Sequence, residues 1–298
     1  MVGSAFKELD TGHDFTLVGS SEYDLRITSQ VDDMIYHHEP DAIIHLAAKV
    51  GGVKGNTDFV ADFFYENIMI NSNVLNSANK AGIKKVVSLL STCVYPDDVS
   101  YPLTEEQIHS GEPHFSNFGY AYAKRMLDVH SRALRQQYGR NYVCAVPNNL
   151  YGPHDNFDLE NGHVVPALIR KIWEAKLHGN TPRFWGDGSP VREFTYSADI
   201  ASALMLVLEK YNESTPINIG YTSEISIKSL VEMICQKLEY DGEVKWDISK
   251  PSGQFKKPSC NNKFMSLGWK NEDYTSLDEG LEKTCKWFLD NYPNVRGM

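Results

Sequence analysis

The sequence lacks several features that would assign it to a class of function. Its 298 residues contain no apolar run near the roughly 20 residues of a membrane span, so we expect no membrane contact. The net charge is −10 with both signs interspersed, which gives no basic face for nucleic acid. The five cysteines form no Cys-x-x-Cys or Cys/His cluster, so we expect no metal site. The first residues lack the order of a signal peptide, which predicts reduced thiols and a cytoplasmic protein.

Short β-rich runs alternate with helical patterns over the first two thirds of the chain, which is typical of a parallel sheet wrapped by helices. We expect strands at 15–18, 42–46, 86–90 and 142–146, and helices near 28–38, 60–81 and 119–138. After about residue 150, further helices are expected near 163–177, 198–211, 226–239 and 277–291. The pattern predicts an α/β fold with two domains: a Rossmann-like, doubly wound sheet over 1–160, to which 193–222 crosses back, and a smaller α/β substrate domain over 161–298.

One further absence concerns the start of the chain. A dinucleotide-binding fold normally opens with a strand and a glycine-rich turn that holds the pyrophosphate. Here only Gly3 stands before a helix-like stretch, in the place of the last glycine of such a turn. We expect either that the natural protein begins upstream of Met1 or that this is a shortened homologue with impaired cofactor binding; a frayed helix start is the plainer reading.

Tyr120 and Lys124 are the first candidate catalytic pair. They stand four residues apart, so they share one face of the predicted helix over 119–138. An ammonium near a phenol favours the phenolate, which predicts a tyrosine pKa below its ordinary value of about 10. The pair suits proton donation to a carbonyl oxygen during reduction, although the same spacing is common on amphipathic helices.

Other small and polar residues follow the predicted strands. Ala47 and Ala48 come directly after one strand and leave room for a cofactor, and Ser91 follows the next, at the sheet edge where ligands bind in such folds. Serine followed by tyrosine and lysine in this order resembles the extended short-chain dehydrogenase/reductase superfamily. Four segments resemble the GDP-L-fucose synthase family more closely: 47–52 (AAKVGG), 91–96 (STCVYP), 149–157 (NLYGPHDNF) and 162–168 (GHVVPAL).

The resemblance implies a two-step reaction on GDP-4-keto-6-deoxy-D-mannose. A base and an acid on opposite faces of the sugar invert C3 and C5, and the matching residues are Cys93 and His163. Hydride from NADPH then reduces C4, with Tyr120 as proton donor, Lys124 tuning it and Ser91 bonded to the carbonyl. Without the flanking motifs, Cys93 would be interpreted as an inert buried thiol, and His163 as a histidine at a helix start or on the surface.

Substrate and cofactor residues follow from the same resemblance. Trp185, Arg192 and either Lys171 or Arg170 match positions that contact the GDP-sugar, and a guanidinium suits a diphosphate. Lys256 and Lys257 are weaker candidates, since solvated surface charge explains them equally well. The remaining assignments are to the cofactor, NADP(H), which the resemblance places against Gly3, Asp24, Leu25, Ala47, Ala48, Tyr120, Lys124, Asn149 and His163; Asn149 is also assigned to the sugar.

Cofactor choice and assembly are less determined by the residues. Ser20 and Ser21 could bond a 2′-phosphate, whereas Glu22 opposes one and the segment 19–25 holds no Arg or Lys before Arg26. The resemblance also implies a homodimer formed through 60–81 and 119–138. Two other functions stay open: a different nucleotide-sugar epimerase or reductase of this superfamily, and a catalytically silent homologue that only binds.

Overall fold

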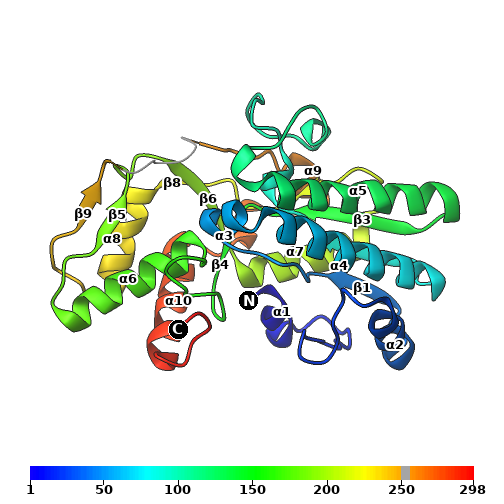
Figure 1. Ribbon diagram of the computed structural model, residues 1–298, viewed down its shortest axis with the longest axis horizontal. Helices are drawn as coiled ribbons and strands as arrows, with labels where there is room; N and C mark the ends of the chain where they lie inside the picture. The colour runs from blue at the N-terminus through cyan, green and yellow to red at the C-terminus, as the bar shows by residue number, and fades with distance from the viewer. Residues whose placement is uncertain (250–255) are drawn as a thin grey trace.

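The computed structural model describes residues 1–249 and 256–298. Its main sheet has four parallel strands in the order β1-β2-β3-β7. These strands are β1 (Ala42–His45), β2 (Lys85–Leu89), β3 (Asn141–Val146) and β7 (Ile217–Asn218). Helices connect them, and the α/β, Rossmann-like class is confirmed (Figure 1).

Helices cover both faces of this sheet because its strands alternate their side chains. Val86 of β2 packs with α2 (Thr28–His38), α4 (Val60–Lys80) and α5 (Phe118–Tyr138). The next residue, Val87, packs instead with α1 (Val2–Ala5) and α7 (Ser197–Lys210). Two separate apolar cores result, and in Figure 1 α4 and α5 run side by side along the sheet.

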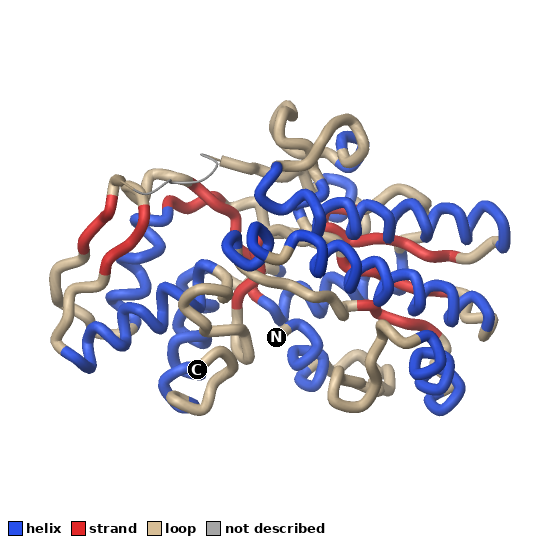
Figure 2. The backbone as a smooth tube through the Cα atoms, in the orientation of Figure 1, coloured by secondary structure: helices blue, strands red, loops and turns tan. Residues whose placement is uncertain are grey.

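A smaller lobe lies beside the sheet and carries the C-terminal part of the chain (Figures 1 and 2). Its core joins three helices to strands of two small sheets, in the orders β4-β6-β8 and β5-β9. Its elements are β4 (Asn149–Tyr151), α6 (Val164–His178), β5 (Arg183–Trp185), β6 (Val191–Tyr196), β8 (Glu224–Ser226), α8 (Ile227–Lys237), β9 (Lys245–Asp247) and α10 (Leu277–Asn291). The division at residue 160 and the crossing of 193–222 stay predictions.

The strand predicted at 15–18 is wrong, since these residues form neither helix nor strand. β1 is the last strand on one side of the described sheet, and residues 15–18 form no ladder with its free edge. Phe15 instead packs edge-on against Phe6, with ring centroids 5.2 Å apart. Leu17 and Val18 are exposed.

The remaining elements are short. They are the helices α3 (Val53–Asp58) and α9 (Asn262–Met265) and the 3-10 turns Phe6–Glu8, Thr92–Val94, Glu105–Gln107, Phe115–Asn117 and Asn271–Asp273. Within the described ranges, none of the helices combines the length and the apolar character that crossing a membrane requires.

Candidate active site

The turn after β2 carries Ser91 and Cys93. Ser91 caps the 3-10 turn Thr92–Val94, and its Oγ accepts a hydrogen bond from the Cys93 backbone N–H at 3.3 Å. This places a hydroxyl and a thiol at the carboxyl end of a central strand, which is the edge where parallel α/β sheets bind ligands. Both side chains are partly exposed, so a ligand at this edge can reach them.

Tyr120 and Lys124 lie on the first two turns of α5 and face the same sheet edge. Lys124 Nζ donates to the Leu89 carbonyl at 2.7 Å and lies 5.9 Å from the centroid of the Tyr120 ring. Gly119 permits this placement, because a Cβ there would stand 2.7 Å from the Val60 carbonyl oxygen of α4. The close packing of α5 on α4 thus fixes the height of the Tyr120–Lys124 pair.

The predicted lowering of the Tyr120 pKa is wrong in the described structure. Burial raises the pKa of Tyr120 above its ordinary value, and the nearby Cys93 raises it further. Burial also lowers the pKa of Lys124 to about 8, because the core disfavours its ammonium. Desolvation therefore outweighs the pairing, and Tyr120 stays a neutral phenol with a proton to donate at neutral pH.

Asn117 is a site residue that the sequence interpretation missed. Asn117 stands at the N-cap position of α5 without a side-chain capping bond, and its Nδ2 instead donates to Cys93 Sγ at 3.0 Å. The Asn117 Oδ1 is buried and has no partner among the described residues. Asparagine is a favoured cap residue, and its position three residues before Tyr120 was the signal available in the sequence.

His163 begins α6 and is paired with a buried carboxylate. Its Nδ1 lies 3.4 Å from Asp155 Oδ1; the Asp155 side chain is 5% exposed and that of His163 is 42% exposed. The hydrogen bond with Asp155 favours the charged imidazolium and raises the pKa of His163. Burial has the opposite but smaller effect. Asp155 was quoted in the 149–157 segment but given no role. Two residues before His163, the Asn161 carbonyl accepts from the Gly52 N–H of the 47–52 loop at 3.0 Å.

Of the predicted substrate residues, Lys257 lies near Cys93 and Arg192, and Asn149 is hydrogen-bonded to the residue after Arg192. Lys257 interacts electrostatically with Cys93 and with Arg192, and burial is the main cause that lowers the pKa of Lys257. Asn149 is exposed at the start of β4, and its Nδ2 donates to the Glu193 carbonyl at 2.8 Å. Lys257, Arg192 and Asn149 therefore border one region at the junction of the two lobes.

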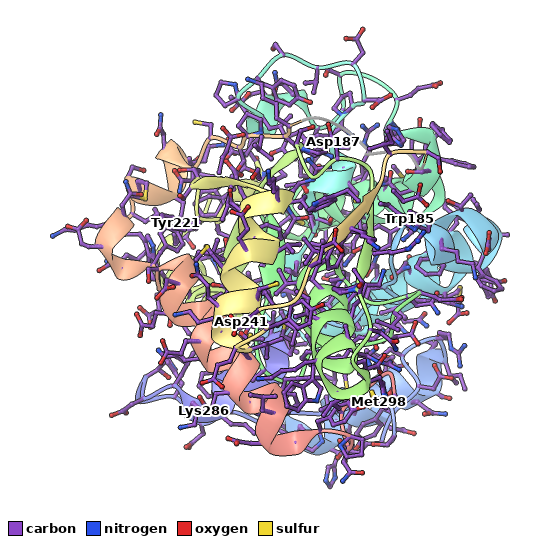
Figure 3. All side chains as sticks on the ribbon, turned by 90° about the vertical axis from the view of Figure 1, so that its left-hand side faces the viewer. Trp185, Asp187, Tyr221, Asp241, Lys286 and Met298 are labelled. Atoms are coloured by element: carbon purple, nitrogen blue, oxygen red, sulfur yellow. The ribbon has the colours of Figure 1, made fainter. Side chains whose placement is uncertain are left out.

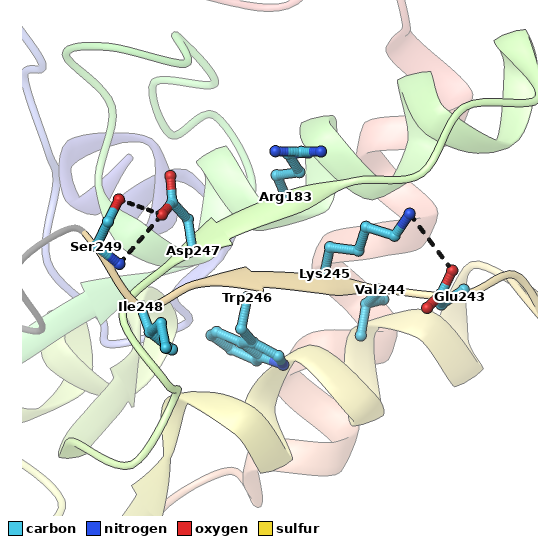
Figure 4. A pocket seen from close by; sticks show the side chains of 8 residues that line it. All are labelled: Arg183, Glu243, Val244, Lys245, Trp246, Asp247, Ile248 and Ser249. Atoms are coloured by element: carbon cyan, nitrogen blue, oxygen red, sulfur yellow. Dashed lines mark hydrogen bonds and ion pairs between the residues drawn. The ribbon is translucent and has the colours of Figure 1, made fainter.

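Lys171 and Trp185 lie in the smaller lobe. Lys171 Nζ donates to the Arg183 carbonyl at 2.8 Å, and Trp185 is 66% exposed on the end of the molecule shown in Figure 3. An open groove of about 480 Å³ in the same lobe is lined by Arg183 of β5 and by residues 243–249, which contain β9. Figure 4 shows Arg183 and Lys245 projecting from these two strands. No sequence prediction fell on this groove.

The residues assigned to the cofactor are consistent with a nicotinamide dinucleotide at the sheet edge. Ala47 and Ala48 follow β1 as half-buried small side chains, and Gly3 packs beside Leu46, 3.9 Å from where its Cβ would stand. Lys124 uses one of its three donors in the described contacts, which leaves capacity for a ribose hydroxyl. Ala47, Ala48 and Lys124 fit NADP(H) on its nicotinamide side, whereas Gly3 was predicted at the pyrophosphate.

At the adenine side, Asp24 and Leu25 come before α2. Arg26 binds the Asp24 carboxylate at 2.7 Å and Glu66 at 3.1 Å. Leu25 packs against the core, and its carbonyl accepts from Asn73 Nδ2 at 2.9 Å. Arg26 is therefore a half-exposed guanidinium at the predicted adenosine end, and a phosphate there would compete with two carboxylates for it.

Comparisons with known proteins agree with this geometry. The model of the NAD dependent epimerase/dehydratase family matches residues 3–220. GDP-L-fucose synthase of Dictyostelium discoideum is 40% identical over 97% of this chain and 91% of its own, and that of Escherichia coli K12 is 36% identical over 100% and 96%. A crystal structure of a GDP-L-fucose synthetase from Naegleria fowleri bound to NADP superposes with a TM-score of 0.91 at 37% identity, over 99% of this chain and 91% of that one. The chain belongs to the NAD dependent epimerase/dehydratase family and, within it, to the GDP-L-fucose synthases.

Proposed function

We propose that this chain converts GDP-4-keto-6-deoxy-D-mannose to GDP-L-fucose by inversion at C3 and C5 and NADPH-dependent reduction at C4. The observation that carries the proposal is the meeting of Cys93 with the buried Tyr120–Lys124 pair at one sheet edge. A thiol and a phenol in one pocket serve both halves of such a reaction. NADPH, when bound, supplies the hydride.

The epimerase half requires a base and an acid on opposite faces of the sugar. The C4 carbonyl acidifies the protons on C3 and C5, so Cys93 as thiolate can remove one and leave an enolate. His163, whose protonated form the hydrogen bond with Asp155 favours, returns a proton to the other face of the carbon and inverts it. The Asn117 Nδ2 donates a hydrogen bond to Cys93 Sγ and so orients the sulfur.

The reductase half uses the same carbonyl. As C4 accepts hydride, its oxygen becomes basic and takes the phenolic proton of Tyr120, while the Ser91 hydroxyl donates a hydrogen bond to it. The neighbouring Lys124 ammonium stabilises the tyrosinate that is left. The raised pKa of Tyr120 keeps the proton in place until that charge develops.

The GDP moiety lies, in this proposal, between the lobes and along the smaller one. Arg192 and Lys257 provide the cations for the diphosphate, and Asn149 contacts the sugar. Lys171 and the exposed Trp185 contact the nucleotide, the tryptophan by stacking on the base.

We further infer that the enzyme is a cytoplasmic homodimer. Phe118, Met126 and Val129 are exposed on one face of α5, and Phe64 is exposed on the neighbouring α4. Exposed large apolar side chains on two helices that pack together favour pairing with a second copy through these helices. The five cysteines are free, which supports a reducing compartment. A monomer by light scattering at micromolar concentration would refute the dimer.

A panel of GDP-, UDP- and dTDP-linked 4-keto-6-deoxy sugars tests the proposal. Oxidation of NADPH with the GDP sugar supports it, and activity confined to a non-GDP sugar indicates another enzyme of the superfamily. Binding of NADPH without turnover of any sugar indicates a silent homologue. Cys93→Ser and His163→Gln should each abolish proton exchange at C3 and C5; intact exchange in both variants contradicts the epimerase roles.

A further inference from the structure

Glu193 is a nearly buried carboxylate to which the reaction assigns no role. It lies on β6 directly after Arg192 and is 3% exposed. Its Oε2 accepts from Ser259 Oγ at 2.6 Å and from Asn148 Nδ2 at 3.3 Å. The Ser259 backbone N–H donates to both carboxylate oxygens, at 3.1 and 3.2 Å. Burial raises the pKa of Glu193, and the hydrogen bonds from Ser259 and Asn148 oppose that shift by favouring the carboxylate.

The carboxylate joins three chain segments that border the substrate region. The backbone carbonyl of Glu193 accepts from Asn149 Nδ2 at 2.8 Å, which joins the start of β4 to β6. The segment of Ser259 is fixed on its other side by Leu103, whose N–H donates to the Pro258 carbonyl and whose carbonyl accepts from the Cys260 N–H. Residues 148–149, β6 and 257–260 therefore meet at Glu193.

Two of the proposed diphosphate ligands flank this junction. Arg192 precedes Glu193 in a strand, so the two side chains point to opposite faces of β6. Lys257 stands two residues before Ser259, and Arg192 is among the charges that lower the pKa of Lys257. The two cations repel one another, and the hydrogen bonds of Ser259 hold their segments together against that repulsion.

We propose that Glu193 is a positioning residue that anchors 257–259 on β6, so that Lys257 and Arg192 converge on the diphosphate of the nucleotide sugar. The inference rests on the proposed function. Glu193 then affects how tightly the nucleotide sugar binds and does not act on the atoms that react. Loss of such an interaction raises KM and leaves kcat nearly unchanged.

Glu193→Gln tests the role with little change of shape. A carboxamide keeps one acceptor oxygen and puts an NH2 donor in place of the other, so it cannot accept from the donors around both carboxylate oxygens, and its NH2 would face the Ser259 N–H or the Ser259 hydroxyl. Calorimetric titration with GDP should show binding weakened about tenfold, with a similar rise in KM for the GDP sugar and kcat within twofold. Glu193→Asp, which restores the charge, should recover part of the affinity. Glu224→Gln is the matched control, since Glu224 is the exposed carboxylate paired with Glu193 in the β6–β8 ladder, and it should bind GDP like the wild type.

The outcomes separate this role from the proposed function. GDP affinity within twofold of the wild type in Glu193→Gln overturns the inference. A roughly tenfold fall in kcat with unchanged KM overturns it as well. If that variant does not fold, Ser259→Ala removes one donor and keeps the carboxylate, and it should weaken GDP binding in the same direction; unchanged binding overturns the role. Wild-type protein that fails to bind GDP overturns the proposed function itself.

Discussion

Replacing Lys124 by methionine tests whether the site keeps a charged lysine in the core at a cost in stability. The residue is 2% exposed, and burial lowers its pKa from 10.5 to about 8. At about 1.4 kcal/mol per pKa unit, the charged form at pH 7 costs roughly 3 kcal/mol of unfolding free energy. The hydrogen bond to Leu89 offsets part of that cost, so the net change at one pH does not isolate it.

The pH dependence isolates the ionisation of Lys124. Its pKa is lower folded than unfolded, so between about pH 8 and 10.5 the unfolded chain binds more protons and stability rises with pH. From pH 7 to pH 9.5 the wild type should gain about 2 kcal/mol from this group, and Lys124→Met should lack that gain. Urea unfolding of both proteins at the two pH values measures the difference. An equal pH response in both would refute the buried ammonium.

Lys85→Met provides the matched control. Burial also lowers the pKa of Lys85 to about 8, but Lys85 lies at the start of β2, at the opposite end of the strand from Ser91. It is only half-buried, so its share of the pH response should be smaller than that of Lys124. Hydride transfer should fall about 10²-fold or more in Lys124→Met and persist in Lys85→Met. A comparable loss of hydride transfer in both variants would show that the loss comes from a damaged fold and not from the removal of a site residue.

Three further variants separate chemistry from packing. Tyr120→Phe should slow NADPH oxidation by about 10²–10⁴-fold and leave C3/C5 deuterium exchange detectable by NMR; loss of both would join the two steps. Asp155→Asn removes the main cause of the raised His163 pKa, so the alkaline limit of exchange should move to lower pH, and an unmoved pH profile argues against the pair. Gly119→Ala adds a Cβ 2.7 Å from a carbonyl oxygen, which should cost about 1–3 kcal/mol and lower Tm by several degrees; an unchanged Tm would contradict the close packing.

The helices were predictable because their apolar residues recur with helical spacing over long stretches. The predicted helices correspond to α2, α4, α5, α6, α7, α8 and α10 with small differences at their ends. Strands were harder to predict, because a strand forms only where it finds a pairing partner and the local sequence does not show which segment that is. The apolar run 15–18 has strand composition but no neighbour to pair with, whereas β5 finds β9 about 60 residues away.

The site residues that belong to a local sequence motif were predictable, and those that reach the site only through tertiary contacts were not. Residues 91–96 and the Tyr120–Lys124 spacing led to the turn after β2 and the start of α5. The sequence could not supply Asn117, Asp155 or Glu193 as partners, because their contacts depend on how loops fold back on the sheet. It also gave the wrong direction for the Tyr120 pKa, since spacing reveals a neighbouring charge but not the depth of burial.

The most direct test of the two-step account is turnover of GDP-4-keto-6-deoxy-D-mannose with NADPH in D₂O, followed by NMR of the product. The account predicts a product with the L-fucose configuration that carries solvent deuterium at both C3 and C5. The same experiment with Tyr120→Phe should yield deuterium in the unreduced sugar. A reduced product that keeps the starting configuration and carries no deuterium at either carbon would contradict the epimerase assignment of Cys93 and His163.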